Sequence, residues 1–223
     1  MTTISAGCTT RRATFACAER QVLCDKLDDL GPAAPTLCAG WTAADLAAHL
    51  VLRERRPEAS VGILAKRLGG YTEAVRRRIL AEHEYPRLVD LVRTAPPRWA
   101  PHRFIPWLDA AMNTVEFFVH HEDLRRAQPG WMPRPITSEY EAELWGRLSG
   151  GAGLLMRSAP VTVVLASPAG RVRAGPVAGE SVTVHGMPSE LLMFACGRQG
   201  QAEVRYEGPE WATAALQVAP FGV

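Results

Sequence analysis

The spacing of apolar residues along the chain changes at about residue 160. Before it, apolar residues recur every three or four positions, which is typical of amphipathic helices; after it, short β-rich runs alternate with Gly, Pro and Ser turns. The expected helices are 11–30, one that begins at Thr42, two within 57–83 separated by a turn at Gly69-Gly70, 86–93, 108–128 and 137–157. Strands are expected at 161–165, 171–173, 181–185 and 202–206, with a helix at 188–196 before the last strand.

This order of elements predicts an α+β protein, with an antiparallel four-helix bundle followed by a small α/β domain that contains an antiparallel sheet. The expected boundaries are 1–128 for the helical bundle, 129–159 for a linker and connecting helix, and 160–223 for the C-terminal domain. So short a C-terminal segment buries only a thin core by itself.

The helix at 108–128 carries a polar stripe on an otherwise apolar sequence. Its polar positions are four, three, four and three residues apart, so they share one face: Asp109, Asn113, Glu116, His120 and Asp123. A solvated face would explain the stripe. However, apolar residues surround it, and a helix that is apolar nearly all round belongs in an interior, where an acid and a histidine one turn apart need a partner such as a metal ion.

A second histidine lies on the helix that follows the Thr42-Ala-Ala-Asp45 sequence, which is close to a capping box and therefore marks a helix start. This residue, His49, has apolar neighbours and has Arg53 one turn further along. A lone histidine in such a setting is usually a hydrogen-bonded core residue. His49 becomes a candidate metal ligand only in combination with the polar stripe on the other helix.

Together, His49, Glu116 and His120 are the candidate ligands of one divalent metal ion. Two imidazoles and a carboxylate suit Zn²⁺, and three protein ligands leave a position for water or substrate. The same set also suits iron, nickel or cobalt. Glu-x-x-x-His recurs by chance on many helices, and His121, about 100° round the helix from His120, is the competing ligand. Asp109, Asn113 and Asp123 are expected to orient the ligands.

Composition narrows the function classes. A formal net charge of +2 predicts no nucleic-acid partner, and no apolar run approaches the ~18 residues of a membrane span. The first residues lack the basic and apolar regions of a secretion signal, so a cytoplasmic location is expected. Five cysteines with no Cys-x-x-Cys pair are expected to be free thiols.

Several segments resemble one known family. These are residues 40–50, from Gly-Trp-Thr to His-Leu, residues 113–126, from Asn-Thr-Val-Glu to Leu-Arg-Arg, the Pro-Pro-Arg-Trp segment at 96–99, and, more loosely, 186–192 and 197–198. They are similar to the mycothiol-dependent maleylpyruvate isomerase family, a group of DinB-like metal-binding bundles, and to an actinobacterial branch of it.

The resemblance implies a DinB-like four-helix bundle followed by a sterol-carrier-like α/β domain. It also implies a histidine, glutamate and histidine metal triad, which matches His49, Glu116 and His120, whereas most other DinB-like bundles use three histidines. Arg198 corresponds to an arginine that helps to bind the acidic substrate, although a cation near a helix C-terminus has a plain structural explanation. Asn113 is the other candidate for catalysis or substrate binding, and Arg53 for a supporting role at the metal.

The implied activity is isomerisation, or thiol transfer to a small electrophilic substrate, with Zn²⁺ as the metal and mycothiol as co-substrate in a monomer or homodimer. Two alternatives remain open. One is a metal-binding module without catalysis, and the other is a metal-dependent hydrolase with Asp109 or Asp123 as general base. A third interpretation, a buried and merely hydrogen-bonded triad, would leave Glu116 buried at a high free-energy cost.

Overall fold

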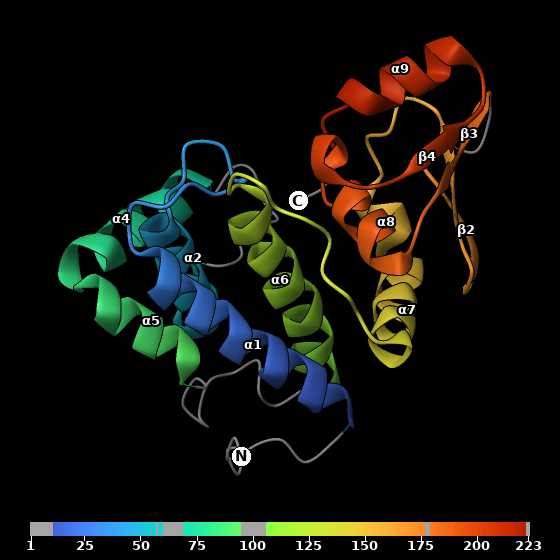
Figure 1. The fold of residues 1–223 in the computed structure, drawn as a ribbon. Helices are drawn as coiled ribbons and strands as arrows, with labels where there is room; N and C mark the ends of the chain where they lie inside the picture. Colours follow the sequence, from blue (N-terminus) through green and yellow to red (C-terminus); the bar gives the residue numbers. More distant parts are fainter. Residues whose placement is uncertain (1–10, 57, 60–68, 95–105, 177–178, 222–223) are drawn as a thin grey trace. The chain divides into compact units, whose positions relative to one another are not determined.

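The structure, a computed structural model, describes residues 11–56, 58–59, 69–94, 106–176 and 179–221 (Figure 1). The side chains of residues 11–14 and 106–112 are outside this description. Three expectations therefore fall on residues that are not described: most of the short helix within 57–68, the Pro-Pro-Arg-Trp segment at 96–99, and the role of the Asp109 side chain. Contacts between residues divide the chain into two compact units, 1–133 and 134–223.

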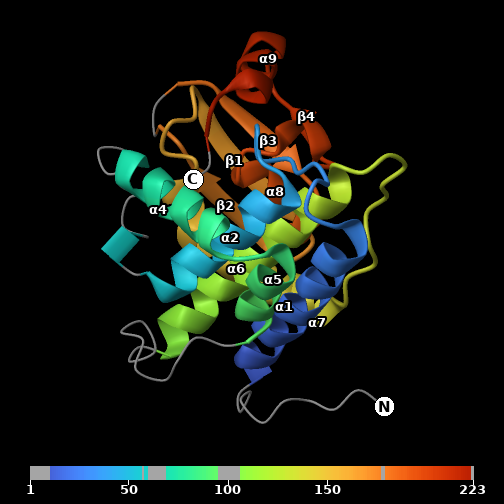
Figure 2. The same ribbon diagram turned by 90° about the vertical axis from the view of Figure 1, so that its left-hand side faces the viewer.

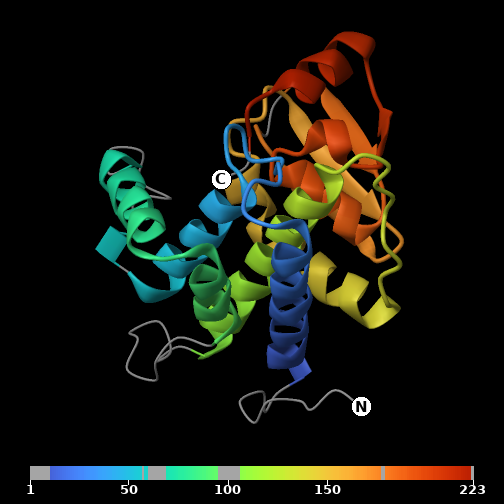
Figure 3. The same ribbon diagram turned by 60° about the vertical axis from the view of Figure 1, so that its left-hand side comes forward.

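The first unit is helical. Its helices are α1 (Arg11–Leu30), α2 (Ala43–Arg55), α4 (Gly69–Glu82), α5 (Tyr85–Arg93) and α6 (Pro106–Arg126). The long helices α1 and α6 lie side by side, and α5 contacts both α1 and α2 (Figures 1 and 3). These ranges follow the sequence pattern closely, except that α4 begins at Gly69, so the two glycines form its first turn and not a break.

Local sequence signals set the ends of α1 and α2. Gly31 has a φ of 77°, a left-handed conformation that favours glycine, and it ends α1. The backbone N–H of Asp45 donates to Thr42 Oγ1 over 3.4 Å, and the backbone N–H of Thr42 donates to the Asp45 carboxylate over 2.9 Å. The predicted capping box is therefore present, and it fixes the start of the helix that carries His49.

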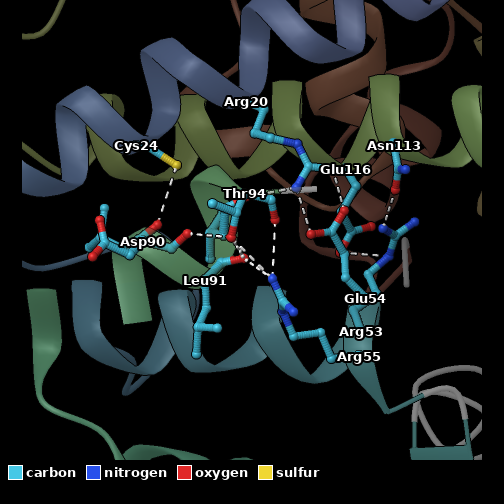
Figure 4. Close-up of polar contacts among 12 residues, drawn as sticks. Arg20, Cys24, Arg53, Glu54, Arg55, Asp90, Leu91, Thr94, Asn113 and Glu116 are labelled. Atoms are coloured by element: carbon cyan, nitrogen blue, oxygen red, sulfur yellow. Dashed lines mark hydrogen bonds and ion pairs between the residues drawn. The ribbon is translucent and has the colours of Figure 1, made fainter. Parts of the chain in front are cut away.

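A buried arginine joins four of the five described helices of this unit, all but α4. Arg20 of α1 donates hydrogen bonds to both carboxylate oxygens of Glu54 on α2, and to the carbonyl oxygen of Val92 on α5 over 2.7 Å (Figure 4). Its guanidinium carbon also lies 4.4 Å from the centre of the Phe117 ring on α6. Because Arg20 and Glu54 are both buried, their pairing constrains how the helices rotate about their axes.

The second unit contains α7 (Ser138–Leu155), β1 (Thr162–Ser167), β2 (Gly170–Ala174), β3 (Ser181–His185), α8 (Pro188–Ala195), β4 (Arg205–Glu207) and α9 (Glu210–Val218). Its strands form one sheet in the order β2-β1-β3-β4 (Figure 2). Helix α8 contacts β1, and α7, which was expected as a connecting helix, packs against α8 and β2.

The expectation of an antiparallel sheet is wrong for its central pair, because β1 and β3 run parallel. The other two pairs, β1 with β2 and β3 with β4, are antiparallel. The backbone N–H of Thr162 at the start of β1 donates to the carbonyl oxygen of Glu180 over 3.2 Å, so β3 enters the sheet beside the start of β1 and continues in the same direction. Side-chain alternation predicts which face a residue occupies, but not which strand becomes its neighbour.

The sequence pattern did not predict α9. Only two of its residues, Ala212 and Leu216, are buried; they lie four positions apart on one face, so the apolar signal is weak. In contrast, α8 lies at the predicted place and has its proline in the first turn.

Two expectations from composition can be compared with the described residues. Cys17 is disulfide-bonded, so the expectation of free thiols is wrong at this position, whereas Cys24, Cys38 and Cys196 are free. Within the described ranges, no helix combines the length and apolar character needed to cross a bilayer.

Candidate metal centre

The polar stripe on α6 lies inside the first unit. Nearly every side chain from Asn113 to Leu124 is buried, including the charged residue Asp123, which is 0% exposed. The histidine of α2, His49, lies opposite this stripe and is 8% exposed. The polar stripe is therefore buried among apolar side chains and does not form a solvated helix face.

The three predicted ligands converge. Glu116 Oε1 lies 3.1 Å from His49 Nε2 and 3.2 Å from His120 Nε2. The two imidazole rings meet edge to face, with their centres 5.2 Å apart. One ligand atom from each residue lies within 4.8 Å of the other two, so a single ion can reach all three.

This donor set fits a divalent metal ion. Nitrogen and oxygen ligands at about 2.0–2.1 Å from a tetrahedral zinc ion are about 3.3 Å apart, close to the separations measured here. The Glu116 side chain keeps 24% exposure, so the ligand atoms are not sealed from solvent. Three protein ligands leave a coordination position for a thiol, a water molecule or a substrate. That these residues bind a metal stays a prediction.

Asp123 contacts His120 at Nδ1, the ring nitrogen that does not face Glu116. His120 Nδ1 lies 2.9 Å from Asp123 Oδ2, and the same carboxylate oxygen accepts a hydrogen bond from the Cys38 thiol over 3.3 Å. With a proton held on Nδ1 by this carboxylate, Nε2, beside Glu116, is the nitrogen of His120 that could bind a metal ion. Carboxylate, histidine and metal are commonly arranged in this way.

Arg53 balances the charge of the acid. Its Nε lies 3.4 Å from Glu116 Oε1, and its Nη1 donates to Asn113 Oδ1 over 2.6 Å (Figure 4). Asn113, one turn before Glu116 on α6, thus holds the guanidinium of Arg53 beside the carboxylate. Both residues lie at the triad, where the sequence placed them.

The pKa values of the triad follow from burial and these contacts. Burial lowers the pKa of His49, although the bond to Glu116 acts in the opposite direction. Burial alone would raise the pKa of Glu116, but Arg53 and the two histidines hold it well below its ordinary value. Burial would lower the pKa of His120, but its contacts with Asp123, Cys38 and Glu116 raise it well above its ordinary value. Glu116 is therefore ionised at neutral pH.

The competing ligand, His121, belongs to another contact. Its Nδ1 lies 2.7 Å from Glu19 Oε1 of α1, and both residues are buried. His121 therefore faces α1 and lies outside the group formed by His49, Glu116 and His120.

Arg198 lies in the second unit, where its Nη1 donates to the carbonyl oxygen of Cys196 over 2.5 Å at the C-terminal end of α8. This contact agrees with the structural explanation of a cation at a helix C-terminus. A role of Arg198 in substrate binding stays a prediction.

Sequence reasoning missed two neighbours of the triad. The ring of Trp41 lies with its centre 5.2 Å from that of His49, and Cys38 contacts Asp123 as described above. Both residues belong to the loop between α1 and α2, and neither has a spacing that marks a site. The available signal was their position just before the capping box of the helix that carries His49.

No protein-family model and no curated protein sequence matches the chain. Solved structures that share its fold include the crystal structure of the mycothiol-dependent maleylpyruvate isomerase, with a TM-score of 0.57, and that of a histidine-to-alanine mutant of the same enzyme, with a TM-score of 0.58. In both comparisons 18% of residues are identical, and the alignment covers 90% of this chain and 94% of the other. The chain therefore has the fold of the mycothiol-dependent maleylpyruvate isomerase, and the resemblance found in its sequence is confirmed at the level of the fold.

Proposed function

We propose that this chain is a divalent-metal-dependent enzyme that uses a low-molecular-weight thiol, mycothiol by resemblance, to isomerise a small electrophilic substrate or to transfer the thiol to it. The observation that carries the proposal is the convergence of His49, Glu116 and His120 on one point, in a fold shared with a mycothiol-dependent isomerase. Zn²⁺ is the ion that the donor set suits best.

Each residue of the site has a distinct part in this proposal. His49, Glu116 and His120 would hold the ion, which when bound would favour the deprotonated, nucleophilic form of a thiol. Asp123 keeps the proton of His120 on Nδ1. Arg53 keeps Glu116 ionised, and a carboxylate in that state is ready to bind a cation.

The rest of the chain is assigned by the same resemblance. We propose that residues 1–128 are a DinB-like bundle and that 160–223 are a sterol-carrier-like domain, joined by the linker and connecting helix of 129–159. Arg198 is proposed to bind an acidic group of the substrate, and Asn113 to position Arg53 beside the site. A cytoplasmic monomer or homodimer, acting on small molecules, is the setting that we expect.

A metal-dependent hydrolase needs a general base beside the ion, and Asp123 is poorly placed for that role. It is fully buried, and its Oδ2 already accepts hydrogen bonds from His120 and Cys38. A base must be free to take a proton from water. The other candidate base, Asp109, has a side chain outside the described residues, so the support for the thiol-dependent activity over the hydrolase comes from the shared fold.

The first test is elemental analysis of the purified full chain, followed by calorimetric titration with mycothiol before and after chelation. We expect about one zinc ion per chain and thiol binding that chelation abolishes. His49→Ala and Glu116→Ala should each lower the zinc retained after dialysis at least tenfold, while the helical circular dichroism signal is preserved. The control is His83→Ala, in the segment between α4 and α5, which should leave the retained zinc unchanged.

The outcomes separate the proposals. Unaltered zinc content in both triad variants would refute the triad. Zinc that is lost in the variants, together with no mycothiol binding to the wild type, would refute the thiol-dependent activity and favour a metal-binding module or a hydrolase.

A further inference from the structure

A second group of metal-ligating side chains lies beside the triad and shares one residue with it. Cys38, His120 and Asp123 each have one ligand atom within 4.8 Å of the other two. Of the three, His120 and Asp123 are buried and Cys38 is partly exposed. The group combines a thiol, an imidazole and a carboxylate.

The loop that carries Cys38 is held against α6 by backbone contacts. The backbone N–H of Leu37 donates to the carbonyl oxygen of Asp123 over 3.1 Å. The backbone N–H of Cys38 donates to Thr36 Oγ1 over 3.1 Å, and the backbone N–H of Trp41 donates to the carbonyl oxygen of Cys38 over 2.9 Å. These contacts hold the backbone of Cys38 beside Asp123 independently of the bond between its thiol and the Asp123 carboxylate.

The distances suit a cation. Asp123 Oδ2 lies 3.3 Å from Cys38 Sγ and 2.9 Å from His120 Nδ1. Ligand atoms around a tetrahedral ion bound by sulfur and nitrogen are roughly 3.5 Å apart, so small side-chain shifts would admit an ion. A thiolate ligand selects soft, thiophilic cations, unlike the nitrogen and oxygen ligands of the triad.

We infer that Cys38, His120 and Asp123 form a second metal site, for a thiophilic cation such as Cd²⁺, and that this site competes with the triad for His120. The inference concerns metal binding only and does not depend on the proposed enzymatic function.

Proton positions explain the competition. A neutral imidazole carries one N–H and one lone pair, so His120 serves the triad through Nε2 or the second site through Nδ1, but not both. When a cation binds at the second site, the thiol proton of Cys38 leaves to solvent. The imidazole proton moves from Nδ1 to Nε2, where Glu116 Oε1, 3.2 Å away, can accept its hydrogen bond. A metal ion at the triad would replace a proton on Nε2 and leave the Nδ1 proton on Asp123, so we expect zinc to prefer the triad. A soft cation gains more from sulfur, so we expect it to prefer the second site.

The test uses the full chain stripped of metal and titrated with Cd²⁺. In a His49→Ala/Glu116→Gln variant, which removes two triad ligands but keeps an acceptor near Nε2, we expect one equivalent of Cd²⁺ to bind with the near-ultraviolet absorption of a cadmium–thiolate bond. Adding Cys38→Ser should remove the absorption and weaken Cd²⁺ binding at least tenfold. Cys196→Ser is the matched control and should change neither.

A measurement on the wild type keeps the inference testable if a triad variant fails to fold. Cadmium-113 NMR of the wild-type chain should give a resonance shifted downfield by a sulfur ligand, and Cys38→Ser should move it upfield. A wild-type resonance without sulfur ligation, or a thiolate absorption that survives Cys38→Ser, would overturn the second site. Neither result would bear on the proposed function, whose failure appears as unaltered zinc content in the triad variants.

Discussion

The contact between Asp123 and His120 gives the sharpest prediction about the candidate site. In Asp123→Asn the side chain keeps its shape but loses its charge, and with it the strong preference for a proton on His120 Nδ1. The substitution leaves the three triad ligands in place. A change in zinc affinity would therefore report on the orientation of His120, and not on the number of ligands.

The expected loss of zinc affinity in Asp123→Asn can be estimated in two ways. Loss of a residue that orients a metal-binding histidine typically weakens metal binding about 10–100-fold, which equals about 1.4–2.7 kcal/mol. A hydrogen bond to a charged group is worth about 1.5–3 kcal/mol. Because Asp123 is 0% exposed, water cannot replace the lost interaction, and we expect the upper part of this range.

The assay is a competition titration in which the protein and a chelating dye share a limiting amount of zinc, at a pH near 7.5, with circular dichroism as a check on folding. Glu122→Gln is the matched control, since Glu122 is the preceding residue on α6, is also fully buried and pairs with Arg125 and Arg126 away from the triad. The control should lose stability but keep its zinc affinity. A folded Asp123→Asn variant with wild-type zinc affinity would refute the proposed role of Asp123 in orienting His120 for zinc.

Other contacts give further predictions. Glu54→Ala leaves Arg20 buried without its carboxylate, so urea denaturation should show a loss of about 3–5 kcal/mol in the free energy of unfolding, and Arg20→Met combined with Glu54→Leu should recover most of it. The hydrogen bond from Arg76 lowers the pKa of Glu73 from 4.5 to about 2, so its stabilising contribution is present above pH 4.5 and is lost as the pH falls toward 2. Urea midpoints at pH 5 and pH 3 should differ less in Glu73→Gln than in the wild type, and an equal difference would refute this assignment. Burial raises the pKa of the Cys24 thiol to about 12, so a thiol reagent at pH 8 should modify Cys24 only after unfolding, as peptide mapping can check.

Much of the first unit could be predicted because its signals are local. The start of α2 follows from two residues, Thr42 and Asp45, whose side chains satisfy the first backbone N–H groups of the helix. The proximity of Glu116 and His120 follows from helix geometry alone, since residues four apart share a face. Only the approach of His49 required information from another helix, and the apolar surroundings of both segments, together with the family resemblance, supplied it.

The features that escaped prediction depend on which distant segments meet. The parallel pairing of β1 with β3 is decided by where Glu180 meets Thr162, and no periodicity within either strand encodes that choice. Cys38 reaches Asp123 across 85 positions of sequence, from a loop that has no ligand spacing of its own. In both cases the sequence shows the strand or the ligating side chain, but it does not show which distant segment pairs with it.

The rotation of α2 links the stability of the first unit to the candidate metal centre. His49 and Arg53 are four residues apart and face Glu116 on α6, whereas Glu54, the next residue, is turned by about 100° toward Arg20 on α1. The buried pair between Arg20 and Glu54 therefore fixes the rotation that presents His49 to Glu116. If this coupling holds, Glu54→Ala should weaken zinc binding as well as folding, although Glu54 touches no metal ligand in the described contacts. The reverse also follows, since an ion that binds only the folded chain stabilises it in proportion to the logarithm of its concentration over its Kd, so zinc should restore part of the stability that Glu54→Ala removes.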